Sequence, residues 1–299
     1  MKIGLIQSTA SPEIEQNVRK TMASVRSAAK RGARIVCLEE FFASLYFCQT
    51  CESSPFELAE PLESAFIGQF RELAAELEIV LVLSWFEKQD EGVFFNSALV
   101  IDVDGSIAGH YRKMHIPDDA QFHEKHYFAP GDLGFCAAET RYGTIGVCIC
   151  WDQWFPEAAR LTALAGAEII FIPTSIGWHE EDIEAGLKDS QFNAWQTIQK
   201  SHAIANSCFV AAVNRCGTEA PSSGAPPIQF WGHSFVTDPH GTILAEAGES
   251  DEVLLADVDF AEIAPVRRMW NFFRDRRIDA YSGILKRSLK NAGGSNGES

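Results

Sequence analysis

The sequence predicts an α/β fold, because short apolar strands alternate with amphipathic helices along the chain. Residues 3–7 and 35–38 are apolar runs, and the segment between them, 12–30, carries apolar residues at helical spacing. Residues 144–172 repeat this strand–helix–strand pattern in the middle of the chain. The hydrophobic content of 46% is ample for a buried core. A layered domain of sheets and helices is therefore expected.

The remaining elements follow from the same patterns. Turn chemistry and apolar runs predict further strands, and helical spacing predicts further helices. The strands are expected at 79–84, 95–101, 107–112, 208–214, 230–237, 242–246 and 253–258, and the helices at 64–77, 191–206 and 260–269. The chain shows no internal repeat and no linker in its middle. We expect one domain over residues 1–290 and a disordered, low-complexity tail over 291–299.

The composition narrows the classes of function. The formal charge of −16 argues against nucleic acid as a partner, since such binding needs basic clusters. The negative charge favours a cationic substrate, although a role in solubility alone would also account for this charge. No apolar run approaches the ~18 residues of a membrane span, so no membrane partner is expected. The N-terminus lacks the pattern of a signal peptide, which predicts a cytoplasmic protein whose 8 cysteines are reduced.

The stretch 143–166 carries the first candidate for chemistry, Cys150. Residues 144–150 have the pattern of a buried strand, and a helix is expected to begin at Pro156. This places the Cys150 thiol at the carboxyl edge of a sheet, where α/β folds bind ligands. A nucleophile and an inert buried cysteine are equally compatible with this segment alone. Cys148, two residues earlier, is expected on the same side as packing, because a zinc site would need a second ligand pair.

Two more charged residues follow predicted strands. Glu39 and Glu40 come after the strand at 35–38, and Lys113 follows the strand at 107–112. Adjacent residues of a strand point to opposite faces, so only one of the two acids can share a pocket with the others. A buried carboxylate can act as a base for a thiol, and an ammonium can stabilise the oxyanion of a tetrahedral intermediate. The set predicts acyl-transfer chemistry without histidine.

The long loop at 114–133 contains His115, His123, Glu124 and His126. Loops of this length in a compact domain are usually functional. The spacing matches no zinc motif, so neither a metal nor another cofactor is expected. Glu124 is the acid that could close over a pocket, with a solvated pair with Lys125 as the alternative. A serine nucleophile elbow and a nucleotide-binding P-loop are both absent from the sequence.

Three segments carry a resemblance to a known family. LEEFF (38–42), YRKMHIPDD (111–119) and GVCICWDQWFPEAAR (146–160) resemble the signature blocks of the nitrilase superfamily of carbon–nitrogen hydrolases. The resemblance implies a Glu-Lys-Cys triad of Glu40, Lys113 and Cys150, with Glu124 as a fourth acid and the Trp151 N–H beside the oxyanion. It also implies a metal-free, four-layer α-β-β-α sandwich and a homo-oligomer built on a dimer.

Within the superfamily, the chain is most similar to the amidases of polyamine biosynthesis that act on N-carbamoylputrescine, in SLYFCQ (44–49) among other segments. A small cationic ureide or amide is therefore the expected substrate. One departure from these amidases is that residues 194–197 read Ala-Trp-Gln-Thr where they carry His-Trp-Arg-Arg. Relatives that act on N-carbamoyl amino acids use an arginine near here to hold a carboxylate, and Gln196 and Thr197 offer no such charge, which disfavours a carboxylate substrate. The expected substrate-binding residues are Trp151, Tyr46, Trp178 and Glu180. Trp178 and Glu180 lie in a second long loop, expected at 173–189, where Glu180 would bind the distal amine or belong to a solvated acidic turn. The alternatives are an N-carbamoyl-β-alanine or ω-amide hydrolase and a non-catalytic binding sandwich.

Overall fold

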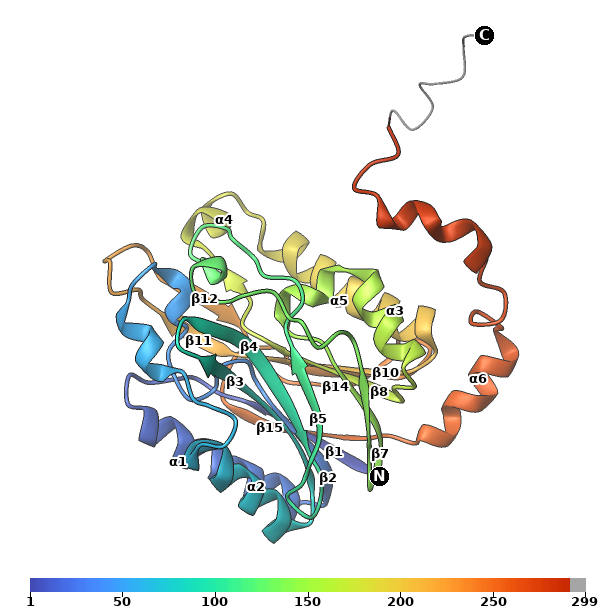
Figure 1. Ribbon diagram of the computed structural model, residues 1–299, viewed down its shortest axis with the longest axis horizontal. Coiled ribbons are helices and arrows are strands. Elements are labelled where there is room, and N and C mark those ends of the chain that lie inside the picture. The colour runs from blue at the N-terminus through green and yellow to red at the C-terminus, as the bar shows by residue number, and fades with distance from the viewer. Residues whose placement is uncertain (291–299) are drawn as a thin grey trace.

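The structure is a computed structural model that describes residues 1–290. Two six-stranded sheets lie face to face, and helices cover the outer face of each (Figure 1). The α1 and α2 helices lie on one outside face, and α3 and α5 on the other. The α/β class and the four-layer α-β-β-α sandwich are confirmed. The predicted tail at 291–299 lies outside the described residues.

The first sheet has the order β15-β1-β2-β3-β4-β5. β1 pairs with β2, and β2 with β3, in parallel, while the other neighbours are antiparallel. Its strands are β1 (Lys2–Gln7), β2 (Ala33–Leu38), β3 (Val80–Asp90), β4 (Val93–Ile101), β5 (Ile107–Arg112) and β15 (Glu252–Asp257), and its covering helices are α1 (Ile14–Lys30) and α2 (Ala65–Leu77).

The second sheet has the order β14-β13-β10-β8-β7-β6, and a small third sheet has the order β11-β12-β9. The strands of the second sheet are β6 (Ala137–Thr140), β7 (Gly143–Val147), β8 (Ile169–Thr174), β10 (Phe209–Asn214), β13 (Phe235–Thr237) and β14 (Ile243–Glu246), and the covering helices are α3 (Pro156–Leu164) and α5 (Lys188–Asn206). The third sheet consists of β9 (Gly177–Trp178), β11 (Cys216–Glu219) and β12 (Ile228–Trp231).

The apolar runs form strands because both of their faces are buried. In β2, Ile35 and Cys37 pack into the core between the two sheets, whereas Val36 and Leu38 pack under the helices. The period-2 alternation of a strand therefore separates two hydrophobic cores instead of a core and solvent. The α2 helix begins where the Ser64 side chain accepts a hydrogen bond from the Ile67 N–H, as an N-cap does.

Two predicted elements differ from the structure. The strand expected at 230–237 is divided between β12 and β13, which belong to different sheets, because Gly232 and His233 both have positive φ and turn the chain. The loop after β8 contains a two-residue strand, β9, and a short helix, α4 (Glu180–Glu184).

The C-terminal part of the described chain leaves the sandwich. The α6 helix (Ile263–Met269) still packs on the sandwich through the buried Ile263 and Val266, and the residues after Phe273 form an arm that extends away from the sheets (Figure 1). Large apolar side chains are exposed along this arm, among them Ile278, Ile284, Leu285 and Leu289. Across residues 1–290, no helix combines the length and the apolarity that crossing a bilayer requires.

Candidate active site

The chain turns sharply at Cys150. β7 ends at Val147 rather than at residue 150, and Cys150 opens the 3-10 helix η4 (Cys150–Trp154) with a φ of 43°. Positive φ is unfavourable for a non-glycine residue, and such strain is concentrated at functional sites. The turn also moves Cys150 into the core between the sheets, whereas Cys148 packs against α3. The prediction that both thiols face one side is therefore wrong, because the strand alternation does not continue to Cys150.

A buried carboxylate, Asp152, holds this turn. Its Oδ2 accepts hydrogen bonds from the Ile149 N–H at 2.9 Å and the Tyr111 hydroxyl at 2.7 Å. Its Oδ1 accepts one from the His115 N–H at 3.0 Å and lies 2.7 Å from His115 Nδ1. Asp152 therefore ties the turn to β5 and to the loop that follows Lys113. Nothing in the sequence distinguished this acid from a surface residue.

Lys113 lies between two carboxylates in the interior. Its Nζ is 3.0 Å from Glu40 Oε1 and 2.6 Å from Glu124 Oε2, and the three side chains are fully buried. Glu40 follows β2, Lys113 follows β5 and Glu124 lies in the short 3-10 helix η3 (Glu124–His126). Three residues that are far apart in the sequence thus form one buried cluster of two carboxyl groups and an ammonium.

Neutral side chains complete this cluster. Asn96 Nδ2 donates to Glu40 Oε1 at 2.7 Å, and the Tyr46 hydroxyl donates to Glu124 Oε1 at 2.9 Å. Glu40 Oε2, by contrast, is buried and has no hydrogen-bond partner within residues 1–290. One oxygen of Glu40 is therefore fixed by Lys113 and Asn96, and the other is available to take a proton.

Ser175 and Arg215 connect Glu40 to the surrounding chain. The Ser175 carbonyl oxygen is 4.0 Å from Cys150 Sγ, and the Ser175 hydroxyl donates to the Glu40 carbonyl oxygen at 3.3 Å. The buried Arg215 guanidinium donates to the carbonyl oxygens of Glu40 at 3.1 Å and Phe41 at 2.8 Å. These bonds stabilise the turn at Phe41, whose φ is 51°. Ser175 thus contacts both Cys150 and the backbone of Glu40.

The environment shifts the pKa values of these groups. Burial, and then the negative charge of Glu40, raises the pKa of the Cys150 thiol well above its ordinary value. Burial lowers the pKa of Lys113, but the charges of Glu124 and Glu40 outweigh this effect and raise it well above its usual range. Burial raises the pKa of Glu124 to about 7, although the Lys113 ammonium opposes that shift. The thiol therefore rests protonated beside an ammonium that stays charged.

A cavity of about 320 Å³ opens beside Cys150. The side chains around it are mostly apolar and aromatic, and its polar lining includes two carboxylates, Asp119 and Asp182. Asp182 belongs to α4 and is oriented by the His179 N–H at 3.2 Å and by Gln191 Nε2 at 2.8 Å. Among the described residues, none of those that line the cavity is a lysine or an arginine.

The chain matches the family model for carbon–nitrogen hydrolases over residues 2–268. This protein belongs to the carbon–nitrogen hydrolase family. Among its curated relatives, an N-carbamoylputrescine amidase from Oryza sativa subsp. japonica is 42% identical over 289 residues, covering 95% of this chain and 94% of the relative. A citrullinase from Francisella tularensis subsp. tularensis is also 42% identical over 289 residues, covering 96% of this chain and 99% of the relative. An ω-amidase from Homo sapiens is 30% identical, covering 96% and 98%.

Solved structures place this carbon–nitrogen hydrolase in the nitrilase superfamily. A carbon–nitrogen hydrolase from Helicobacter pylori G27 superposes with a TM-score of 0.93 at 45% identity, covering 97% of this chain and all of that one. Saccharomyces cerevisiae Nit3, a member of branch 10 of the nitrilase superfamily, superposes with a TM-score of 0.75 at 28% identity, covering 93% and 96%. The resemblance inferred from the three sequence segments is confirmed at the level of the family.

The predicted substrate-binding residues of this hydrolase are not all at the cavity. Trp151 lines it, in the first turn of η4, where backbone N–H groups lack partners inside the helix. Tyr46, Trp178 and Glu180 are not among the lining residues. Tyr46 bonds Glu124 instead, Trp178 packs on Trp231 at a centroid distance of 5.2 Å, and Glu180 is exposed on α4.

The histidine-containing loop also has a different role from a ligand cluster. His115 contacts Asp152, and its ring stacks on Phe155 at 3.8 Å. His123 lies 3.7 Å from Asp118, at the surface. Within residues 1–290, no group of three or more His, Cys, Asp or Glu side chains is arranged to hold a metal ion.

Proposed function

We propose that this carbon–nitrogen hydrolase cleaves N-carbamoylputrescine to putrescine, carbon dioxide and ammonia, with Cys150 as the nucleophile. The observation that carries the choice of substrate is the charge of the cavity wall, where Asp119 and Asp182 supply carboxylates and no lysine or arginine is present among the described lining residues. The distal end of N-carbamoylputrescine is an ammonium group. Its pairing with a carboxylate is stronger than a neutral hydrogen bond.

Glu40 is the proposed base. Its unpartnered Oε2 takes the thiol proton as Cys150 Sγ attacks the ureido carbon. Lys113 and the Trp151 N–H stabilise the negative charge that develops on the ureido oxygen. A resting thiol suits this sequence of events, because a thiolate and an ionised Glu40 side by side would repel each other.

The remaining steps return the enzyme to its starting state. The proton on Glu40 passes to the NH₂ group, the C–N bond breaks and ammonia leaves, so that a carbamoyl thioester remains on Cys150. Glu40 then takes a proton from water, whose oxygen attacks the thioester carbon. The C–S bond breaks, the sulfur regains its proton from Glu40, and the released carbamate decomposes to putrescine and carbon dioxide.

The amine-binding acids differ from the sequence-based expectation. Glu180 lies on the exposed side of α4, two residues before Asp182, whose carboxylate lines the cavity. We infer that Asp182 and Asp119, which both line the cavity, bind the distal ammonium in place of Glu180. Position in the sequence alone could not separate these acids, because residues 173–189 were expected to form a long loop, whereas the α4 helix determines which acid points inward.

Citrulline is the second candidate substrate. The citrullinase relative supports it, and so do two buried donors at the cavity, Gln153 Nε2 and Trp231 Nε1, which have no partner within the described chain. These N–H groups could donate to the carboxylate that citrulline carries and N-carbamoylputrescine lacks. An uncharged donor pair stabilises a carboxylate less than an arginine would, so we rank this candidate second.

The test is ammonia release from matched compounds. N-carbamoylputrescine, citrulline, N-carbamoyl-β-alanine, a linear ω-amide and butylurea are compared by kcat/KM. We expect N-carbamoylputrescine to be the best substrate, ahead of butylurea, which has the same ureide and lacks the amine. Asp119→Asn/Asp182→Asn should lower kcat/KM for N-carbamoylputrescine by about 10- to 100-fold, the loss of a charge-assisted hydrogen bond, and leave butylurea almost unchanged. Preference for citrulline, or an equal loss with both ureides, would overturn the assignment.

A further inference from the structure

A second cavity, of about 90 Å³, is lined by Phe41 and shares no lining residue with the cavity beside Cys150. It forms where the first sheet opens. The registered pairing of β2 with β3 ends at Cys37–Val82, and Glu60 then runs beside β3, bonded to the Phe86 carbonyl oxygen at 2.9 Å. The chain that leaves β2 turns away at Phe41. A gap therefore remains between this chain and the segment at Glu60, and we call the cavity in this gap the notch.

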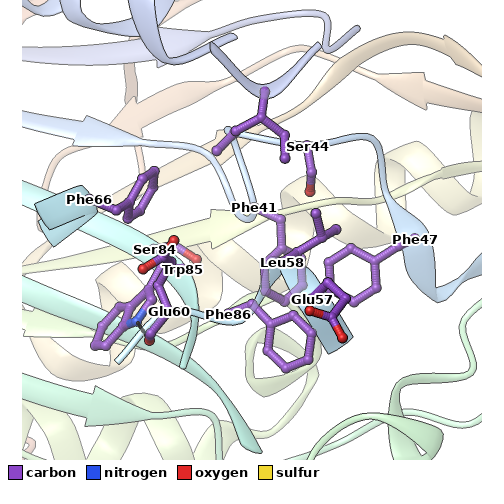
Figure 2. Close-up of a pocket in the computed structure, with 12 residues that line it drawn as sticks. Phe41, Ser44, Phe47, Glu57, Leu58, Glu60, Phe66, Ser84, Trp85 and Phe86 are labelled. Carbon is purple, nitrogen blue, oxygen red and sulfur yellow. Dashed lines mark hydrogen bonds between the residues drawn. The ribbon is translucent and has the colours of Figure 1, made fainter. Parts of the chain in front are cut away.

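Five aromatic side chains line this notch. Figure 2 shows Trp85 and Phe66 on one side, and Phe41, Phe47 and Phe86 on the other. Leu58 lies among these rings, and Ser44 lies at one end. The faces of aromatic rings carry partial negative charge, so a wall of this kind attracts cations.

The polar groups of the notch favour the same kind of ligand. Glu57 and Glu60 both line it, and none of the described lining residues is a lysine, arginine or histidine. Ser84 also lines it; the side chain is fully buried, and its hydroxyl has no hydrogen-bond partner in the described chain. A hydroxyl oxygen of this kind can accept a hydrogen bond from a ligand N–H, and a buried polar group without a partner is unfavourable.

We propose that this notch is a binding site for a small primary ammonium ion. The alkyl chain would pack against Phe66 and Trp85, and the ammonium would lie near Glu57, Glu60 and the Ser84 hydroxyl. The volume of this cavity exceeds the roughly 10–15 Å³ that one water molecule needs, so the cavity has room for a small organic cation. This site goes beyond the proposed reaction and does not depend on it.

The test uses n-butylammonium chloride and the full-length Cys150→Ser variant. Trp85 Nε1 donates to the Glu60 carbonyl oxygen at 3.0 Å, so its indole N–H resonance reports on the notch. We expect this resonance, identified by its loss in Trp85→Phe, to shift with saturation as n-butylammonium is added. Sodium butyrate, which has an anion of similar length, should leave the resonance in place.

A matched pair of variants separates the notch from the catalytic cavity. Glu57→Gln/Glu60→Gln should weaken n-butylammonium binding at Trp85 by about tenfold, since two carboxylate partners are lost. Glu63→Gln, an exposed acid that does not line the notch, should leave the affinity unchanged. The proposal is overturned if n-butylammonium shifts only the indole signals of Trp151, Trp154 and Trp231 at the catalytic cavity. It is also overturned if the Trp85 signal does not move, or if its titration is the same in both variants.

Discussion

Glu39 and Glu40 are adjacent acids with opposite surroundings, and substitution of Glu39 gives the sharpest stability test. The Glu39 side chain is 2% exposed, and its Oε2 has no partner in the described chain. Burial raises its pKa from 4.5 to about 8; the bond to its own backbone N–H and the charge of Arg215 only partly oppose this shift. The folded state is therefore most stable when the Glu39 carboxyl is protonated.

The sign and size of the effect follow from linkage. A carboxyl whose folded pKa is raised contributes stability that is fully present below pH 4.5 and is lost as the pH rises through about 8. One unit of pKa difference between the folded and unfolded chain corresponds to about 1.4 kcal/mol. Ionisation of Glu39 in the unfolded chain therefore lowers the free energy of unfolding by about 3 kcal/mol at pH 7 and by less than about 1 kcal/mol at pH 5. Glu39→Gln is neutral at every pH, so its stability relative to the natural protein should rise by about 2–3 kcal/mol between these two values.

The assay is urea unfolding of both proteins at pH 5, 6, 7 and 8, with the midpoint and the slope fitted at each pH. Glu40→Gln is the matched control, because it is one residue away and removes the proposed base. Glu39→Gln should retain turnover, whereas Glu40→Gln should lower kcat by about 10²–10⁴. If the stability curves of Glu39→Gln and the natural protein run parallel across this pH range, burial does not raise the pKa of Glu39 and the reasoning is refuted.

Three further predictions concern other parts of the molecule. Because the pKa of Glu124 is raised to about 7, its carboxylate becomes protonated and turnover should fall as the pH drops through 7. Glu124→Gln should turn over slowly at every pH and lose this pH dependence, which a pH–rate profile of each protein measures. Asp152→Asn should lower the free energy of unfolding measured in urea by about 2–4 kcal/mol, since an amide cannot accept all four hydrogen bonds of the carboxylate. It should also slow the alkylation of Cys150, and an unchanged alkylation rate would contradict the role of Asp152 in positioning Cys150. We also propose that the exposed C-terminal arm contacts another subunit of a homo-oligomer. Removal of residues 271–299, which include exposed Ile284 and Leu285, should then lower the mass measured by light scattering, and an unchanged mass would count against that role.

Much of the fold could be predicted from the sequence because its strands are buried on both faces. Such strands appear as continuous apolar runs, and helices between them keep their own spacing, so the order of elements was readable. The division of residues 230–237 between two sheets could not be predicted, because nothing in the composition indicates the left-handed backbone at His233. The end of β7 was misplaced for the same reason, since Cys150 takes a positive φ inside an apolar run.

The charged centre was predicted better than the substrate cavity. Strand parity indicated that only one of Glu39 and Glu40 could face Lys113, and Glu40 does. The partners that orient the centre, such as Asn96, Asp152 and Arg215, are polar residues whose burial depends on contacts distant in the sequence. Their roles could not be predicted before the strands were placed.

The central claim is that Cys150 forms a covalent carbamoyl intermediate, and mass spectrometry of the rapidly quenched enzyme tests it most directly. When the reaction with excess N-carbamoylputrescine is quenched in acid, we expect the peptide containing Cys150 to gain the mass of substrate minus ammonia, and this adduct to be absent in Cys150→Ser. Full turnover by Cys150→Ser, or an adduct on a different residue, would contradict it.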